Sequence, residues 1–315
     1  MIKKNILITS AGVATAVNVI SSLRKSTKFT FNIIAIDMNK NSVGLYLADK
    51  FYIVKNSKDN EFLPGLIKIL KDENIEFIFP LHSSEIAFFS SNIAIFEKLH
   101  IGIIIPSEKV VKTCINKNLF EKFLEKNNFP YPKTYKNENE INTYPIFIKL
   151  KQGSSSIGAF KINSKEELNF YLKNNKHNYL IQEYINWDEI TIDCYVNKNN
   201  ILVGFVPRYR IKVKDGKSVV AKTMFSEKLQ SIITILLKKL KYKGACNIQV
   251  FYNNDEIKII ELNPRLSAGG LPLTTQAGVN IPELMIEDYF GKVENKILSY
   301  NQNLTMYRYL SEVFV

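Results

Sequence analysis

Glu261-Leu262-Asn263-Pro264-Arg265 is the stretch of sequence that decides both the fold and the chemistry. It closes the run Ile257–Asn263, which alternates like a β-strand, and we expect Ile257, Ile259, Glu261 and Asn263 to share one face. A carboxylate on a core-facing row is costly unless it is paired or bound to a cation. The pattern therefore predicts a polar site at the end of a strand.

A partner strand precedes this stretch at Asn247–Phe251. A three-residue loop at 254–256 would set Gln249 opposite Glu261 on the same face, so that Gln249, Glu261 and Asn263 bring oxygen donors together. Hard oxygen donors with few carboxylates suit Mg²⁺ that is also held by phosphate oxygens. Arg265 adds a fixed cation for an anionic group. The alternative is a hydrogen-bonded polar hairpin end that Pro264 terminates.

Composition limits the classes of protein that remain. The chain has 315 residues, 46% of them hydrophobic, which allows a large core in two or three lobes. Three distant cysteines, Cys114, Cys194 and Cys246, argue against a disulfide scaffold or a zinc site and fit a reducing cytoplasm. No apolar run reaches membrane-spanning length, so we expect no membrane contact. The net charge of +12 comes from scattered lysines without interleaved aromatics, and we expect no nucleic-acid partner.

The first third of the chain alternates between strand and helix patterns. We expect strands at 5–9, 31–37, 52–54, 77–80 and 102–105, with helices at 14–25, 61–73 and 84–99 between them. This alternation predicts a parallel, doubly wound sheet. Ser10-Ala11-Gly12 followed by Asp37 forms only half of a dinucleotide fingerprint. We interpret this lobe as a scaffold that binds no nucleotide.

The pattern changes near Ser107, and we place a domain boundary near residue 113. A helix is expected at 116–127, and the chain from Tyr144 onward is typical of strands and hairpins, with helices near 165–174 and 227–240. The fold class is therefore α/β, changing to α+β in the C-terminal part.

Lys149 is difficult to explain inside the apolar strand Pro145–Lys151 unless it serves as a cation for phosphate. The strand is followed by Gln152–Gly158, a loop of small residues whose backbone N–H groups and hydroxyls suit close approach to phosphate. The spacing is not that of a Walker A loop, and a surface hairpin loop is the alternative.

Further binding groups follow this loop. The backbone at the end of the strand Tyr179–Ile185 would pair with an adenine edge, and Glu189 would take ribose hydroxyls. Arg208 and Arg210, flanked by hydrophobic residues, suit fork-like contacts to carboxylate or phosphate. A solvated strand face is the alternative for the two arginines.

The order of these parts resembles the ATP-grasp enzymes, closest to the branch of the carbamoyl phosphate synthase large subunit, and the resemblance covers nearly the whole chain. It implies a Rossmann-like pre-ATP-grasp lobe at 1–113 and a two-subdomain ATP-grasp domain at 114–315. The latter would divide into a lid at 114–181 and a metal-binding subdomain at 182–315.

The resemblance also implies roles for individual residues. ATP would be held by Lys117, Lys149, Lys151, the loop residues Gly153, Ser154, Ser155, Ser156 and Gly158, and then Glu183, Tyr184, Ile185 and Glu189. Gln249, Glu261 and Asn263 would coordinate Mg²⁺, with Mn²⁺ as a substitute. The catalytic and substrate-binding cations would be Lys149, Arg208, Arg210 and Arg265, beside the loop 267–271.

Two positions depart from the family pattern. A glutamine, Gln249, stands where many relatives have an acidic first metal ligand, and Leu150 replaces the usual proline after the strand lysine.

We therefore expect an ATP-dependent ligase that joins a carboxylate to an amine or ammonia through an acyl phosphate, giving an amide, ADP and phosphate. A kinase, or a carbamoyl-phosphate-synthase-like phosphotransferase, would use the same site and stop at the phosphate. A non-catalytic nucleotide-binding subunit would lack some of the expected metal ligands or lysines, whereas this sequence has all of them. A dinucleotide oxidoreductase is disfavoured by the missing glycines. The expected partners are a small-molecule carboxylate and an amine, and a homodimer is a further expectation.

Overall fold

The computed structural model describes residues 2–151, 158–173, 179–291 and 293–315. Its first lobe is a parallel four-stranded sheet in the order β3-β2-β1-β4. The strands are β1 (Ile2–Ile8), β2 (Phe29–Asp37), β3 (Lys50–Ile53) and β4 (Phe77–Phe79). Its helices are α1 (Ala14–Arg24), α2 (Val43–Leu47), α3 (Phe62–Asp72), α4 (Ser83–Ser91) and α5 (Ile93–Lys98). One buried cluster lies on each face of this sheet, which confirms the doubly wound lobe.

Two expectations for this lobe are wrong. The helix expected at 84–99 is broken at Asn92, whose side-chain amide donates to Phe88 O and ends α4 before α5 begins. The strand expected at 102–105 forms only one bridge, from Gly102 to Phe77. Pro106 lacks a backbone donor and the chain then enters the next helix, so the pairing does not extend.

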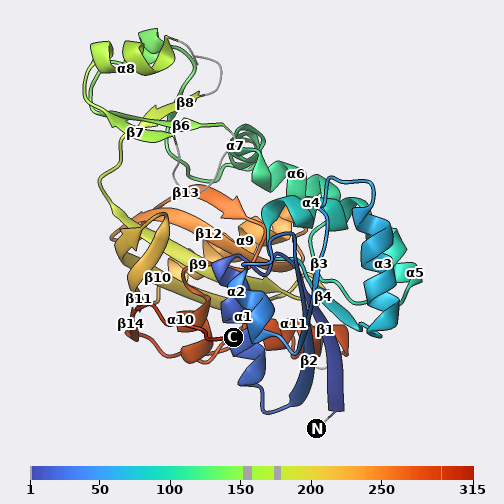
Figure 1. Cartoon of the computed structure of the whole chain (residues 1–315). Coiled ribbons are helices and arrows are strands. Elements are labelled where there is room, and N and C mark those ends of the chain that lie inside the picture. The colour runs from blue at the N-terminus through green and yellow to red at the C-terminus, as the bar shows by residue number, and fades with distance from the viewer. Residues whose placement is uncertain (1, 152–157, 174–178, 292) are drawn as a thin grey trace.

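Helices α6 (Glu108–Ile115) and α7 (Lys117–Lys126) connect the first lobe to the rest, so the expected boundary at residue 113 lies inside α6. The side chain of Asn116 accepts from the backbone N–H groups of Asn118 and Leu119 and caps α7. Phe120 and Leu124 of α7 pack into the core of the large C-terminal sheet. These two helices thus form a bridge between the lobes (Figure 1).

A small antiparallel sheet in the order β5-β8-β6-β7 projects from the body of the molecule together with α8 (Figure 1). We call it the lid sheet. Its elements are β5 (Thr134–Tyr135), β6 (Ile146–Leu150), β7 (Ala159–Ile162), β8 (Tyr179–Glu183), α8 (Lys165–Leu172) and the short 3-10 helix Glu138–Glu140. The lid sheet has its own small core around Ile146, Ile148 and Leu168.

The largest sheet has six strands in the order β13-β12-β9-β10-β11-β14, and every paired neighbour is antiparallel. The strands are β9 (Asp188–Val196), β10 (Leu202–Lys214), β11 (Lys217–Thr223), β12 (Gly244–Asn253), β13 (Glu256–Asn263) and β14 (Thr305–Tyr307). Helix α9 (Glu227–Leu240) covers one face with Leu229, Ile233 and Leu236. A parallel lobe followed by antiparallel sheets is the architecture that the sequence predicted.

Two helices were missed by the sequence analysis, α10 (Leu271–Gln276) and α11 (Ile281–Tyr289). Both have a proline in the first turn, and α11 is buried almost all round, so neither has a clear amphipathic period. Both pack against α1 of the first lobe (Figure 1). Their apolar side chains share one buried cluster with Val19, Ile20 and Leu23 of α1. The first lobe is therefore held in place by a core that it shares with the C-terminal part.

The hairpin of β12 and β13 departs from the predicted geometry. Its turn has two residues, Asn254 and Asp255, both with positive φ, and a register shift follows between Gln249 and Val250. Gln249 still pairs with Glu261. The expectation that Ile257, Ile259, Glu261 and Asn263 share one face is wrong. Ile257 and Ile259 enter the core, whereas the bulge turns Glu261 and Asn263 to the opposite face, where they line a pocket.

None of the helices in the described residues is long and apolar enough to cross a membrane.

Candidate active site

A pocket lies where the lid sheet faces the large sheet, and we call it the inner pocket. Strands β6, β7, β9, β10, β12 and β13 contribute side chains to it. An apolar end is formed by Phe147, Ala159, Phe251 and Ile260. The charged lining side chains are Lys117, Lys149, Arg208, Arg210, Lys217 and Arg265, against Glu189 and Glu261. Six cations face two carboxylates, so the inner pocket suits a polyanion with an apolar group at one end.

Glu261 and Asn263, at the end of β13, lie side by side in this pocket. The Asn263 amide nitrogen donates to Glu261 Oε1 at 2.8 Å and to Asn247 Oδ1 at 3.3 Å. Asn247 in turn donates to the backbone oxygen of Arg265 at 3.1 Å. Asn247 was missed by the sequence analysis, although it pairs directly with Asn263 in the hairpin. This network fixes the amide and the carboxylate with oxygen atoms available to a cation.

Gln249, the third expected metal ligand, lies in the same pocket with different partners. In the amide orientation that satisfies its neighbours, its nitrogen donates to Glu189 Oε1 and its oxygen accepts from Arg210 Nη1, both at 3.1 Å. Arg210 Nη1 also contacts Glu189 Oε1 at 2.6 Å. Burial raises the pKa of the Glu189 carboxyl, and Arg210 opposes this shift. Gln249 is thus part of a group with Glu189 and Arg210.

The donor set fits a metal that is shared with a ligand. Among the residues that the structure describes, no group of three or more His, Cys, Asp and Glu side chains could hold a metal ion by itself. Glu261 supplies one carboxylate, and the other nearby oxygens are amide oxygens of Asn263 and Gln249. One carboxylate with neutral oxygens suits Mg²⁺ completed by phosphate oxygens and water.

Lys149 is only 8% exposed, although it is a lysine on the strand β6. Its pKa is lowered to about 8, mainly by burial and also by the nearby Lys117, whereas Glu261 and Glu121 oppose the shift. Lys117, at the first position of α7, donates from Nζ to Leu150 O at 3.2 Å. Two lysines from different elements therefore line the inner pocket together, and their expected contact with phosphate remains a prediction.

Arg208 is held inside the large sheet. Its Nη1 lies 2.8 Å from Asp193 Oδ2, and both side chains are 2% exposed. Ser267 and Thr274 also donate to Asp193 Oδ2. Arg208 Nε has no hydrogen-bond partner among the residues that the structure describes, although Arg208 lines the inner pocket. The solvated-face alternative is therefore wrong for Arg208, and its guanidinium is fixed by a buried carboxylate.

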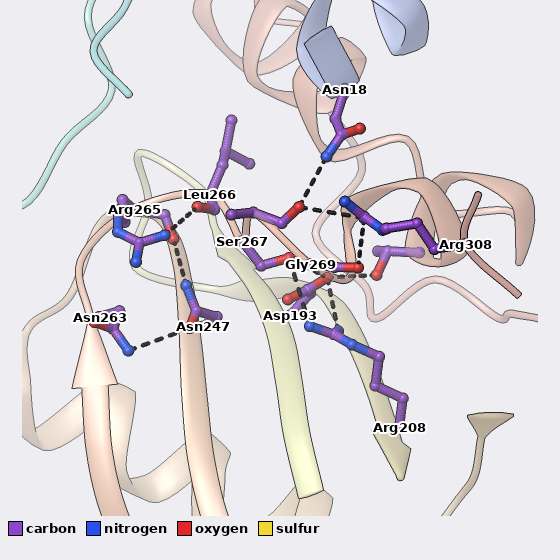
Figure 2. Close-up of polar contacts among 12 residues, drawn as sticks. Asn18, Asp193, Arg208, Asn247, Asn263, Arg265, Leu266, Ser267, Gly269 and Arg308 are labelled. Atoms are coloured by element: carbon purple, nitrogen blue, oxygen red, sulfur yellow. Dashed lines mark hydrogen bonds and ion pairs between the residues drawn. The ribbon is translucent and has the colours of Figure 1, made fainter. Parts of the chain in front are cut away.

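The loop 265–270 follows β13 and is fastened from several directions (Figure 2). Asn18, on α1 of the first lobe, donates to Ala268 O at 3.0 Å. Arg308, just beyond β14, donates to Gly269 O at 2.9 Å and to Ala268 O at 3.4 Å. Neither Asn18 nor Arg308 was identified from the sequence, because their partners are distant in the chain. The contact of Asn18 spans 250 positions, and the two contacts of Arg308 span 39 and 40.

Glu183, Tyr184 and Ile185, whose backbone is expected to contact adenine, have other contacts in the structure. Glu183 N donates to Lys133 O at 2.9 Å, and Glu183 Oε1 accepts from Lys133 N and from Lys258 Nζ. The Tyr184 ring faces Lys161 at 4.4 Å. Glu183, Tyr184 and Ile185 do not line the inner pocket as the structure stands. Their expected contact with adenine remains a prediction.

The residues around the Gly/Ser loop are described only at its two ends. Lys151 lies outside the inner pocket and lines another depression beside α7. Gly158 has φ +71°, and a Cβ there would lie 2.6 Å from the Leu150 side chain, so the position requires glycine. Gly153, Ser154, Ser155 and Ser156 lie outside the described residues.

A second pocket, which we call the interlobe pocket, has a volume of about 640 Å³ and lies between the first lobe and β13. Its first-lobe wall is formed by the turn before α1 and the segment after β4, including Val13, Leu81 and His82. It shares a wall with the inner pocket, made of Lys117, Lys217, Glu261, Asn263, Arg265 and Ala268. Two ligands, one in each pocket, would therefore meet beside Glu261 and Arg265.

The groups of the partial dinucleotide fingerprint in the first lobe, at Ser10–Gly12 and Asp37, contact one another and neighbouring side chains. Asp37 Oδ2 accepts from Gly12 N at 2.7 Å, and a Cβ on Gly12 would lie 2.6 Å from Ser42 Oγ. Asp37, which would bind ribose in a dinucleotide site, is thus engaged by the turn itself. This geometry agrees with the interpretation of the lobe as a scaffold.

Comparisons with known proteins agree with this arrangement. Residues 175–312 match the family described as ATP-grasp in the biosynthetic pathway with Ter operon, and residues 6–104 match the PylC-like N-terminal domain.

Two curated relatives are similar in sequence. The carbamoyl phosphate synthase large chain of Clostridium acetobutylicum is 25% identical over 78% of this chain and 24% of its own length. The D-alanine–D-alanine ligase of Petrotoga mobilis is 28% identical over 45% of this chain and 55% of its own length. The chain thus spans well under two thirds of the length of either relative.

Two solved structures have a similar fold. Biotin carboxylase of Campylobacter jejuni, in a complex with a β,γ-ATP compound, gives a TM-score of 0.74 at 19% identity, covering 96% of this chain and 74% of that one. The biotin carboxylase domain dimer of Hydrogenobacter thermophilus 2-oxoglutarate carboxylase, with MgADP, ADP and bicarbonate, gives 0.72 at 18% identity, covering 96% and 73%. These two likenesses show a shared fold. The family matches over residues 6–104 and 175–312, with the similarity to the curated relatives, identify the chain as an ATP-grasp superfamily protein with a PylC-like N-terminal domain.

Proposed function

We propose that this protein is an ATP-dependent ligase that joins a small-molecule carboxylate to an amine or ammonia. A carboxylate resists attack because its carbonyl is electron-rich and oxide is a poor leaving group. Phosphorylation removes both obstacles. A carboxylate oxygen bonds to the γ-phosphorus of ATP as the bond to the bridging oxygen breaks, and ADP leaves with that electron pair. The amine nitrogen then bonds to the acyl carbon, phosphate leaves, and the amine releases one proton.

The observation that carries this proposal is the wall shared by the two pockets. Lys117, Lys217, Glu261, Asn263, Arg265 and Ala268 line both of them. ATP in the inner pocket would place its terminal phosphate at this wall. An acceptor in the interlobe pocket would reach the same wall from the other side. Such positioning is the main contribution that a protein makes to phosphoryl transfer.

We propose one direction for the nucleotide in the inner pocket. Its adenine would lie at the apolar end, between Phe147 of the lid sheet and Phe251 of the large sheet, with the backbone of 183–185 at its edge. The phosphates would then extend toward Lys117 and Lys149. The buried Lys149 has no ion-pair partner within the described residues, so its charge is available to phosphate.

Magnesium would be held by Glu261 and Asn263 together with phosphate oxygens. When bound, the ion would neutralise phosphate charge and orient the terminal phosphoryl group. Gln249 is the weakest of the three expected ligands, because its amide already bonds Glu189 and Arg210. We propose that Gln249 holds Glu189 for the ribose hydroxyls and reaches the metal only after that group rearranges.

The arginines would have separate tasks. Arg265 lies in the shared wall and would stabilise the charge of the transferring phosphoryl group. Arg210 would orient Glu189. Arg208, fixed by Asp193, would present its unpaired Nε to an anionic group in the inner pocket. The Gly/Ser loop up to Gly158 would close over the phosphates and keep water from the acyl phosphate.

The test is ADP release from Mg²⁺-ATP with pools of acids and amines, with the product mass recorded. ADP release that requires both an acid and an amine, with a product of acid plus amine minus water, supports the ligase. A stable phosphorylated product from one acceptor would instead identify the kinase or carbamoyl-phosphate-synthase-like reaction. Lys149→Met should lower kcat/KM by about 10²–10³. The control Lys68→Met, at an exposed position of α3, should leave it unchanged. Sedimentation of the same samples tests the proposed homodimer.

A further inference from the structure

The composition of the interlobe pocket limits the chemistry of its ligand. Its volume of about 640 Å³ is that of a small-molecule site. It is separate from the apolar end of the inner pocket, and only the shared wall joins the two. The inference below rests on the proposed function, in which this pocket receives the acceptor.

Cations dominate the charged lining of the interlobe pocket. Lys117, Lys217 and Arg265 line it, and among the described lining residues Glu261 is the single carboxylate. Glu261 Oε1 already accepts from Asn263. An ammonium group beside the acceptor carboxylate would therefore face cations and would have no carboxylate of its own. An unpaired charge of this kind is costly to bury.

Two acids of the first lobe lie near the pocket but do not line it. Asp37 accepts from the backbone N–H groups of Gly12 and Asn39. Glu85 is 9% exposed and accepts from Thr9 Oγ1, and burial raises the pKa of its carboxyl. Both carboxyl groups are used inside the lobe, so neither is available to a ligand ammonium.

Another part of the lining of the interlobe pocket is apolar. Val13, Leu81, Cys114, Ile115, Leu262 and Pro264 line it. Burial raises the pKa of the Cys114 thiol, which is therefore neutral at pH 7 and behaves as an apolar side chain. This wall favours an acceptor with a carbon body of several atoms over a very small acid such as bicarbonate.

His82 adds one neutral polar group at the rim. Its Nδ1 accepts from Ser84 N, so the remaining ring proton lies on Nε2. Burial, and then the charge of Arg265, hold the pKa of His82 below its ordinary value. A neutral imidazole donates one hydrogen bond, which suits a carbonyl or hydroxyl oxygen on the ligand.

We propose that the interlobe pocket takes a carboxylic acid with an apolar body and no ammonium group beside the carboxylate (a keto, hydroxy or N-acylated acid rather than a free α-amino acid). The carboxylate would lie toward Arg265 and Lys217, where it meets the terminal phosphate of ATP. The carbon body would lie against Leu81, Cys114 and Ile115.

Matched pairs of acids test this proposal: 4-methyl-2-oxopentanoate and N-acetyl-leucine against leucine, and 3-phenylpropanoate against phenylalanine. Each acid is given with Mg²⁺-ATP and hydroxylamine, which converts an acyl phosphate to a hydroxamate without the natural amine. We expect the ammonium-free member to give a kcat/KM at least tenfold higher. Equal or faster turnover of the amino acids would overturn the proposal while leaving the ligase intact. ADP release without hydroxamate from any acid would overturn the proposed function itself, and the inference with it.

A pair of variants tests whether the missing carboxylate in the pocket, and not a general effect of a new charge on the protein, sets the preference between acids. Ile115→Glu places a carboxylate in the pocket at a position that is 40% exposed, so the fold should tolerate it. We expect it to shift the preference toward the amino-acid member of each pair by about two- to fivefold, the effect of a partly exposed new partner for ammonium. Ile235→Glu, 51% exposed on α9 and remote from both pockets, is the control and should leave the preference unchanged. An unchanged preference in Ile115→Glu would contradict the proposal that the acid lies against Leu81, Cys114 and Ile115.

Discussion

Gly270→Ala should destabilise the protein far more than a single methyl group suggests. A Cβ at Gly270 would lie 1.8 Å from Arg208 Cζ, 1.9 Å from Nη2 and 2.2 Å from Nε. The backbone of Gly270, at φ −109° and ψ −19°, is open to alanine, so only the contact matters. Arg208 is 2% exposed and is paired with Asp193, so its guanidinium can move away from a new methyl group only by disturbing that pair.

The magnitude follows from two contributions. Overpacking of a close-packed interior costs about 1–3 kcal/mol, and displacing Arg208 from Asp193 would leave a buried charge unpaired, which costs about 3–5 kcal/mol. We expect a loss of free energy of unfolding of at least about 3 kcal/mol. The guanidinium of Arg208 can make room for the new methyl group only by giving up its contact with Asp193. A chain of this size loses roughly 2 °C of Tm per kcal/mol, so the shift should be about 6 °C or more.

Differential scanning calorimetry of four variants (Gly270→Ala, Gly65→Ala, Arg208→Ala and the double variant Gly270→Ala/Arg208→Ala) tests this reasoning. Gly65→Ala, on α3, is the matched control, because a Cβ there meets nothing within 4 Å, and it should be neutral or stabilising by about 0.5–1 kcal/mol. In an Arg208→Ala background, Gly270→Ala should cost less than about 0.5 kcal/mol, since its clash partner is gone. An equal cost of Gly270→Ala in both backgrounds would refute the contact with Arg208 as its cause.

Three further outcomes are expected at the site. Below about pH 8, Lys149 is protonated with or without ATP, whereas above its lowered pKa the phosphates must first restore its proton. ATP affinity should therefore fall as pH rises above about 8, by up to tenfold per unit, and calorimetry in two buffers should detect proton uptake at pH 9 but not at pH 7. Glu261→Gln should raise the Mg²⁺ concentration for half-maximal activity about tenfold or more, and an unchanged Mg²⁺ requirement would remove Glu261 from the metal site. Arg308→Gln frees the Gly269 and Ala268 carbonyls and should lower kcat/KM for the acceptor about tenfold with little change in KM for ATP, while Arg24→Gln, on the first-lobe surface, should change neither.

The architecture could be predicted from the sequence where periodicity is strong. Alternating strands and helices identified the parallel lobe, and the strand patterns indicated hairpins from Tyr144 onward, whereas the division into two subdomains came from the family resemblance. Helix α11 was missed because burial on nearly all sides removes the amphipathic period that marks a helix, and α10 was missed because its six residues are too few to show one.

The candidate site was predictable in its residue types but not in its pairings. The apolar run around Lys149 indicated a buried cation, and Lys149 is indeed buried in the inner pocket. The pairing of Gln249 with Glu261 was also correct, although the two-residue turn and the bulge that produce it were not expected. A bulge changes which side chains share a face without changing composition, so alternation alone assigned Ile259 and Glu261 to the same side.

Contacts between distant segments could not be predicted. The pair of Arg208 with Asp193 depends on the register of β10 against β9. The bonds from Asn18 and Arg308 to the loop 265–270 depend on how the first lobe and the segment after β14 pack. Each of these residues is an ordinary polar residue in its local sequence, and only the fold brings their partners within reach.

The most direct test of the central claim follows oxygen from the acceptor to phosphate. A carboxylic acid that supports ADP release is labelled with ¹⁸O in its carboxylate and turned over with Mg²⁺-ATP and its amine. The acyl phosphate route predicts ADP, and one ¹⁸O atom in the released phosphate for each amide formed. Amide formation with unlabelled phosphate, or with AMP and pyrophosphate in place of ADP and phosphate, would contradict the account.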